Sequence, residues 1–140
     1  MLQPLIMTQK KKVALVEDNE DCREILATMI RLMGYELIVP LDSEVDETID
    51  VIVVYLDFPQ MHILGTIRAL RDDQRTKNIP IIGFLPWPYR EGTLATLDAG
   101  ANDVFDGPLT FEALGSAIEK YAPDTSHQCD SAPTTKMRVA

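Results

Sequence analysis

Cysteine is scarce in this chain, which has two in 140 residues, Cys22 and Cys129. Cys22 falls on the apolar side of an expected helix and Cys129 in a polar stretch. We therefore expect no disulfide, and a reducing compartment fits this cysteine usage. The chain also lacks a Cys-X-X-Cys pair, a glycine-rich phosphate loop and a Ser-His-Asp arrangement. The missing phosphate loop argues against a small-ligand or enzymatic domain.

Basic residues are also few, with 13 Lys and Arg against 22 Asp and Glu, a formal net charge of −9. Nucleic acid and anionic membranes bind preferentially to basic protein surfaces, so we expect neither as a direct partner. No apolar run approaches transmembrane length, and residues 1–7 are too short and too poor in basic residues for a signal peptide. The sequence thus predicts a cytoplasmic protein whose acidity serves solubility or a basic partner protein.

The length of 140 residues suits one domain with a buried core. Residues 1–10 are expected to be an irregular lead-in, residues 11–122 the folded domain and residues 123–140, rich in Ser, Thr, Asp and Pro, a disordered tail. Within the domain, apolar runs alternate with helical patterns. The expected strands are 13–16, 35–39, 51–56, 79–85 and 103–105; the expected helices are 22–33, 64–70, 89–99 and 111–121, with a stub within 42–50.

Helix boundaries are signalled by specific residues. Asn19 or Asp21 is expected to cap the first helix and Gly34 to end it, while Thr110 caps the last helix. The helix 89–99 is expected to bury Leu94 and Leu97 and to stop at Gly100. The apolar face of the first helix comprises Cys22, Ile25, Leu26, Met29, Ile30 and Met33, and that of the last helix Phe111, Leu114, Ile118 and Tyr121.

This alternation predicts an α/β fold with a parallel five-stranded sheet of order 2-1-3-4-5 and helices on both faces. Such sheets hold their sites at the carboxyl ends of the strands, at the point where the strand order reverses. Here that point lies between the first and third strands. Four side chains are expected to meet there: Glu17, Asp18, Tyr55 and Asp57.

Several motifs share the spacing of a known family. They are Leu15-Val-Glu-Asp-Asn-Glu-Asp21, Pro59-Gln-Met61, Ile79-Pro-Ile-Ile82 and Ala99-Gly-Ala-Asn-Asp103 followed by Pro108. By these motifs the chain resembles a response-regulator receiver domain of two-component signalling, from about Lys11 to Tyr121. The resemblance implies a flavodoxin-like (βα)5 fold. It also implies Mg²⁺ held by acidic residues, and an aspartate that takes a phosphoryl group from a histidine kinase.

The chain departs from the family at most of the positions that carry this chemistry. The acidic pair is present as Glu17 and Asp18. The phospho-acceptor position is Tyr55, the hydroxyl position Leu85, the lysine position Gly107 and the switch-aromatic position Val104. A phenol is largely protonated at pH 7, unlike a carboxylate. Without the lysine, no side chain at that position offsets a phosphoryl charge. We therefore predict that the phosphoryl relay does not operate.

Two further readings of the acidic residues remain open. Asp57 lies two residues beyond Tyr55 and is an alternative acceptor; with Glu17 and Asp18 it would make a Mg²⁺-dependent phospho-accepting receiver. Without a third carboxylate, Glu17 and Asp18 would bind Mg²⁺ only weakly, because most of the octahedral shell would be water. A flavodoxin-like small-ligand or enzymatic domain is a further alternative.

The segment Pro86-Trp87-Pro88-Tyr89 also has two interpretations. Trp87 and Tyr89 could be contacts for a partner, since aromatic residues dominate interface hot spots, or Trp87 could fold back over the apolar corner at Leu85.

Taken together, the sequence predicts a stand-alone, degenerate receiver that is not an enzyme. It would act by docking to a protein, such as a histidine kinase or another two-component protein. The docking surface would be formed by the helix 89–99, the strand 103–105 and the helix 111–121.

Overall fold

The computed structural model describes residues 10–39, 48–56 and 63–122. Several predicted features fall outside these ranges: nearly all of the lead-in, most of the 42–50 stub, Asp57, the motif Pro59-Gln-Met61 and the tail from 123 to 140. The following description concerns the described residues alone.

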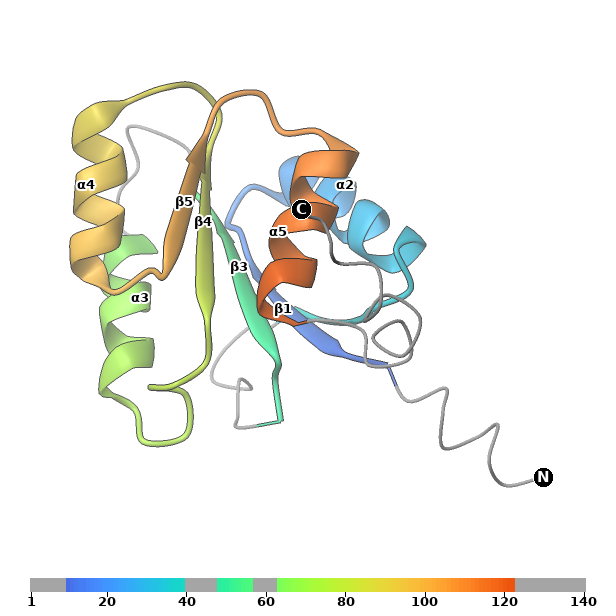
Figure 1. Cartoon of the computed structure of the whole chain (residues 1–140), viewed down its shortest axis with the longest axis horizontal. Helices are drawn as coiled ribbons and strands as arrows, with labels where there is room; N and C mark the ends of the chain where they lie inside the picture. Colours follow the sequence, from blue (N-terminus) through green and yellow to red (C-terminus); the bar gives the residue numbers. More distant parts are fainter. Residues whose placement is uncertain (1–9, 40–47, 57–62, 123–140) are drawn as a thin grey trace, which may run out of the picture.

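The core is a parallel five-stranded sheet. Its strands are β1 (Lys12–Val16), β2 (Glu36–Ile38), β3 (Val51–Tyr55), β4 (Ile81–Leu85) and β5 (Asp103–Asp106), in the order β2-β1-β3-β4-β5 (Figure 1). This confirms the predicted order. The central strands are apolar throughout because both of their faces are covered; every residue of β4 is buried.

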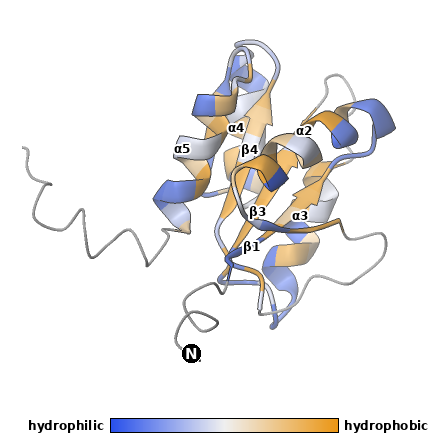
Figure 2. Ribbon diagram, turned by 90° about the vertical axis from the view of Figure 1, so that its right-hand side faces the viewer, coloured by the Kyte–Doolittle hydropathy of each residue, from blue (hydrophilic) through white to orange (hydrophobic). Residues whose placement is uncertain are grey.

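Four helices cover the two faces of the sheet: α2 (Glu20–Leu32), α3 (Ile63–Asp72), α4 (Arg90–Ala99) and α5 (Phe111–Tyr121). Helices α2 and α5 share one apolar core with residues such as Leu15, Val53 and Phe84. Helices α3 and α4 share the other, with residues such as Ile52 and Leu85. Hydrophobic residues accordingly concentrate along the strands, whose ribbon is mostly orange in Figure 2.

The predicted helix signals act as expected. Asn19 caps α2, its Oδ1 accepting the Cys22 amide at 2.9 Å, and Thr110 caps α5 by accepting the Ala113 amide at 3.0 Å. Gly34 and Gly100 follow α2 and α4 with φ of +96° and +131°. These are left-handed conformations that glycine adopts at little cost, which explains why both helices end there.

The predicted orientation of α4 is wrong. Leu94 and Leu97, expected to be buried, are 54% and 41% exposed, whereas Thr96 is fully buried. The reason is close packing of α4 on β4, where a Cβ on Gly83 would lie 2.9 Å from Thr96 Cγ2. The space there admits small side chains, so the leucines face outward.

Two other residues of the predicted apolar faces also lie largely in solvent. Ile25 on α2 is 62% exposed and Phe111 on α5 is 47% exposed. The α2 core contacts come instead from Leu26, Ala27 and Ile30. The sequence pattern was therefore broader than the stripe that the sheet covers.

Candidate functional site

The carboxyl ends of β1 and β3 lie side by side. Val16 pairs with Val54 in the parallel register, so the next residues, Glu17 and Tyr55, are level with each other at the edge of the sheet. This is the site predicted from the strand order. It brings the first acidic residue to the predicted acceptor position, while Asp57 lies outside the described residues.

The acidic pair is divided between the interior and the solvent. Glu17 is 6% exposed, and its Oε2 accepts a hydrogen bond from the Asn19 amide at 2.8 Å. Arg23 Nη1 donates to the Glu17 carbonyl oxygen at 2.7 Å, which fixes the turn between β1 and α2. Asp18 is exposed. The two carboxylates therefore occupy different surroundings although they are adjacent in sequence.

Tyr55 belongs to an apolar layer. It is half-buried and packs against the core that β1, β3, α2 and α5 share. Its register partner on β4 is Phe84, whose ring stacks on that of Phe105 with centroids 5.3 Å apart and planes at 21°. The edge of the sheet at the acceptor position thus carries aromatic rings.

The tips of β4 and β5 are joined through the backbone. Leu85, at the predicted hydroxyl position, is 1% exposed and lies in the α3–α4 core, and its carbonyl oxygen accepts the Gly107 amide at 3.1 Å. Gly107, at the predicted lysine position, has φ of +147°, a conformation that L side chains rarely adopt. Val104, at the switch-aromatic position, is half-buried against the same core.

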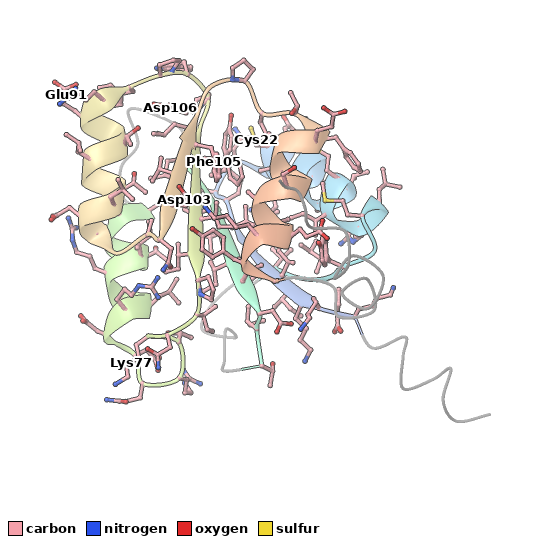
Figure 3. The ribbon with its side chains drawn as sticks, in the orientation of Figure 1. Cys22, Lys77, Glu91, Asp103, Phe105 and Asp106 are labelled. Atoms are coloured by element: carbon pink, nitrogen blue, oxygen red, sulfur yellow. The ribbon has the colours of Figure 1, made fainter. Side chains whose placement is uncertain are left out.

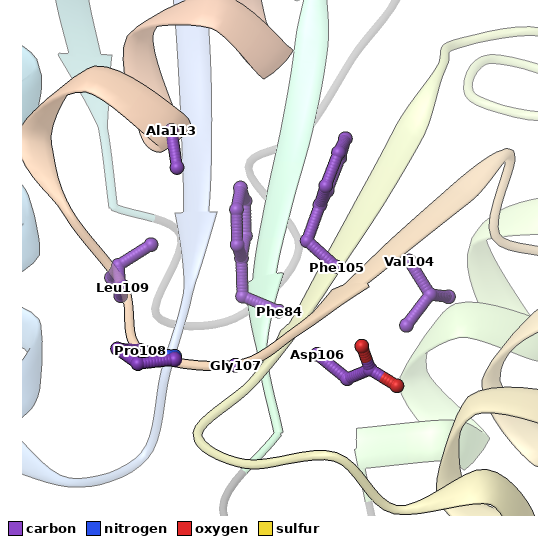
Figure 4. A pocket seen from close by; sticks show the side chains of 8 residues that line it. All are labelled: Phe84, Val104, Phe105, Asp106, Gly107, Pro108, Leu109 and Ala113. Carbon is purple, nitrogen blue, oxygen red and sulfur yellow. The ribbon is translucent and has the colours of Figure 1, made fainter.

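A shallow cavity of about 340 Å³ opens beside these strand ends (Figure 4). It is lined by Phe84, Val104, Phe105, Asp106, Gly107, Pro108, Leu109 and Ala113. Asp106 is the one charged residue among these, and its Oδ2 accepts from Thr93 Oγ1 at 3.3 Å. A phosphoryl group placed here would meet a carboxylate and apolar carbon, and no cation among the lining residues.

The described residues do not fit a dedicated Mg²⁺ site. Within residues 10–39, 48–56 and 63–122, no three His, Cys, Asp or Glu side chains gather closely enough to hold a metal ion. Mg²⁺ prefers near-octahedral oxygen ligation, and Tyr55 supplies no carboxylate where a third would be needed. Glu17 and Asp18 are the two acidic residues that the described part of the site offers.

Comparisons with known proteins give a consistent result. No family model matches the chain. It is 27% identical over 116 residues to the chemotaxis protein CheY1 of Helicobacter pylori, covering 77% of this chain and 94% of CheY1. It is 23% identical to a hybrid signal transduction histidine kinase of Dictyostelium discoideum, of which it spans 8%. The receiver domain of a Pseudomonas aeruginosa sensor histidine kinase, with magnesium in its active-site cleft, superposes with a TM-score of 0.69 at 20% identity, covering 81% of this chain and 98% of that one.

The chain is therefore similar in sequence to CheY proteins and similar in fold to receiver domains. Its five-stranded sheet has their fold and strand order. Glu17, Tyr55, Leu85 and Gly107 lie at the carboxyl edge of the sheet. Val104 lies further back in β5, paired with Gly83 in the middle of β4, and Asp57 is outside the described residues. The structure brings together Glu17 with Tyr55 and Leu85 with Gly107.

The aromatic residues before α4 differ in exposure. Trp87 is 47% exposed, so almost half of this side chain is accessible to a partner. Tyr89 is half-buried, and its ring lies against Gly92 in the first turn of α4. Of the two side chains, Trp87 is therefore the more accessible.

Sequence reasoning did not find the stacked pair of Phe84 and Phe105. The available signal was that each phenylalanine is the last residue but one of its strand.

No described helix is long and apolar enough to span a membrane.

Proposed function

We propose that this chain is a signalling module that acts by docking to a protein partner and does not use aspartyl phosphorylation. The observation that carries the proposal is the pair Leu85 and Gly107. Where a phosphoryl group would need a hydroxyl and a cation, one residue is buried apolar carbon and the other a glycine at φ +147°. Under this proposal the protein does not catalyse a reaction.

The docking surface that we propose includes α4. Trp87, Leu94 and Leu97 together expose large apolar side chains on and just before this helix. Exposed apolar groups that cluster on one element are typical of interaction sites. Glu91 at the start of α4 and Asp106 at the end of β5 lie toward the same end of the molecule (Figure 3). They favour a partner that carries basic residues beside an apolar contact.

The partner class follows from the relatives. Matched proteins include a hybrid signal transduction histidine kinase and CheY proteins. We propose a histidine kinase or another two-component protein as the partner, and no nucleic acid. The acidic net charge of −9 supports the exclusion of nucleic acid.

The phosphorylation part of the proposal is tested with Mg²⁺ and acetyl phosphate or beryllofluoride. Trp87 fluorescence and intact mass are followed during the titration. We expect no added phosphoryl mass and no Mg²⁺-dependent change in fluorescence. A matched variant, Tyr55→Asp with Leu85→Thr, restores a carboxylate and a hydroxyl while leaving Gly107 in place. It shows whether the assay detects added phosphoryl mass or a change in Trp87 fluorescence.

The same experiment tests the rival function, a Mg²⁺-dependent phospho-accepting receiver that uses Asp57. Glu17 and Asp18 favour this rival because they retain the acidic pair of a receiver, and the Pseudomonas receiver domain holds magnesium in its cleft. A Mg²⁺-dependent gain of one phosphoryl group in the unmodified chain, abolished by Asp57→Asn, would establish the rival and refute our proposal.

A further inference from the structure

Helix α2, on the opposite face of the sheet from α4, exposes a stripe of residues that carries two large apolar side chains. Ile25 and Leu32 are 62% and 73% exposed, the largest exposures among the big apolar side chains of the described residues. Asp21 and Thr28 complete the line at i, i+4, i+7 and i+11, which lie on one side of a helix. Cys22 and Met29 border the stripe and are half-buried.

Charges of opposite sign stand on the other border of this stripe. Glu24 and Arg31 are both exposed and lie seven residues apart in α2. Seven residues of helix span about 10 Å, so the two side chains are separated by two turns and do not form an i, i+4 pair. The helix thus carries an acidic group near one end of the stripe and a basic group near the other.

We propose that two copies of this chain associate through α2, packed antiparallel about a two-fold axis. In that arrangement Glu24 of each copy faces Arg31 of the other, so that one charge pair occurs twice. Ile25 and Leu32 of each copy cover the stripe of the other. The surface is therefore complementary to itself in one orientation.

The charges select both the orientation and the occupant. A parallel pair would set Glu24 against Glu24 and Arg31 against Arg31, which is repulsive. A partner helix of a single charge sign would satisfy one of the two residues and repel the other. The second copy satisfies both, which is why we assign the stripe to self-association.

The dimer should be weak. One pair of helices buries less than the roughly 1,600 Å² of a standard interface. Because α2 and α4 cover opposite faces of the sheet, a dimer through α2 leaves the proposed docking surface open. The inference is independent of the proposed docking function, and either can fail without the other.

Charge reversal in the full chain tests the pairing. Sedimentation equilibrium from about 10 µM to about 1 mM covers the affinity range of weak interfaces. We expect a concentration-dependent dimer. Glu24→Arg and Arg31→Glu should each raise the dissociation constant about tenfold, because each turns both attractive pairs into repulsive ones. The double variant Glu24→Arg/Arg31→Glu should return to within about threefold of the original value.

Glu119→Arg, an exposed change of the same sign on α5, is the matched control and should leave the dimer unchanged. Circular dichroism checks that each variant is folded. A chain that stays monomeric across the range overturns the proposal, even if it binds a helix of another protein. So does a double variant that associates no better than the single ones.

Cross-linking tests the register. In a Cys129→Ser background, Leu32→Cys places a thiol opposite Cys22 of the second copy. The two positions are about 15 Å apart along one helix, too far to be bridged within a copy. Mild oxidation should therefore yield a covalent dimer in which peptide mapping joins Cys22 to position 32. A link between the two copies of position 32 would show a parallel pair and overturn the proposal.

Discussion

The amide of Gly107 donates a hydrogen bond to the carbonyl oxygen of Leu85 over 3.1 Å. This bond ties together the two strand ends at which a receiver places its lysine and its hydroxyl residue. Leu85 is buried and Gly107 sits at φ +147°. Restoring either family residue therefore meets an obstacle already present in the fold: a filled core at one position and a disfavoured backbone at the other.

Replacing Gly107 by lysine should destabilise the chain by about 1–2 kcal/mol, because a Cβ is disfavoured at this φ. Gly65 is a matched control. A Cβ at either glycine would meet nothing within 4 Å, but Gly65 lies in the helix α3. Gly65→Lys should stabilise by about 0.5–1 kcal/mol through helix propensity. Urea denaturation of both variants measures the contrast. Equal effects would show that backbone conformation does not decide the residue at position 107.

Replacing Leu94 and Leu97 by serine should change the free energy of unfolding by less than about 1 kcal/mol, because both side chains lie largely in solvent. The matched control is Leu114→Ala in α5, a fully buried leucine whose truncation should cost about 2–5 kcal/mol. If the α4 leucines cost as much as Leu114, the sequence-based expectation that they are buried is right and the docking surface is lost.

Arg71 should be the most sensitive charged residue for stability. It donates to the carbonyl oxygens of Gly100 at 2.8 Å and Ile79 at 2.7 Å, and to Asn102 Oδ1 at 2.5 Å, which joins α3 to the starts of β4 and β5. Partial burial lowers its pKa. Arg71→Met should cost about 2–3 kcal/mol by leaving these acceptors without their charged donor.

Arg68→Met, an exposed change in the same helix, provides the comparison for Arg71 and should lie within about 0.5 kcal/mol of the original stability. Thermal unfolding of the two variants measures the difference. Similar melting temperatures would mean that the Arg71 hydrogen bonds do not contribute to stability.

Packing of α4 on β4 should depend on the contact of Gly83 with Thr96. A Cβ at Gly83 would lie 2.9 Å from Thr96 Cγ2, and Thr96 is fully buried. Gly83→Ala should therefore destabilise by about 1–3 kcal/mol. Thr96→Ser removes the methyl group, so Gly83→Ala should cost less in that background. An unchanged cost in a double-mutant cycle would contradict the contact.

The attachment of α5 to β5 should weaken at alkaline pH. Lys120 of α5 donates a hydrogen bond to Asp103 Oδ2 of β5 at 3.2 Å. This bond is the main cause that raises the pKa of Lys120, and the charges of Tyr121 and Asp103 raise it further. A raised folded pKa contributes stability that is complete below the unfolded value of about 10.4 and is lost as the pH rises through the folded value.

Asp103→Asn keeps an acceptor for the Tyr121 hydroxyl, which donates at 3.0 Å, but removes the charge. NMR titration of Lys120 should then show its pKa moving down toward the ordinary value, and the alkaline loss of stability should shrink. A titration identical to that of the original chain would show that Asp103 does not govern Lys120.

The sequence by itself determined the fold and the position of the candidate site residues in it. The alternation of apolar runs and helical patterns specified the parallel sheet and its order, and Asn19, Gly34, Gly100 and Thr110 specified helix ends, because these signals act within a few residues along the chain. Local spacing likewise placed Tyr55, Leu85 and Gly107 at the carboxyl edge.

Only the tertiary structure decided which apolar side chains are covered. Leu94, Leu97, Ile25 and Phe111 follow helical periodicity, yet the tight approach of Thr96 to Gly83 and the placement of α2 on the sheet leave them exposed. Burial depends on what packs against a helix from distant parts of the chain, and the periodicity of one helix does not contain that information. The stacking of Phe84 on Phe105 and the φ of Gly107 have the same origin, since each depends on two strands meeting.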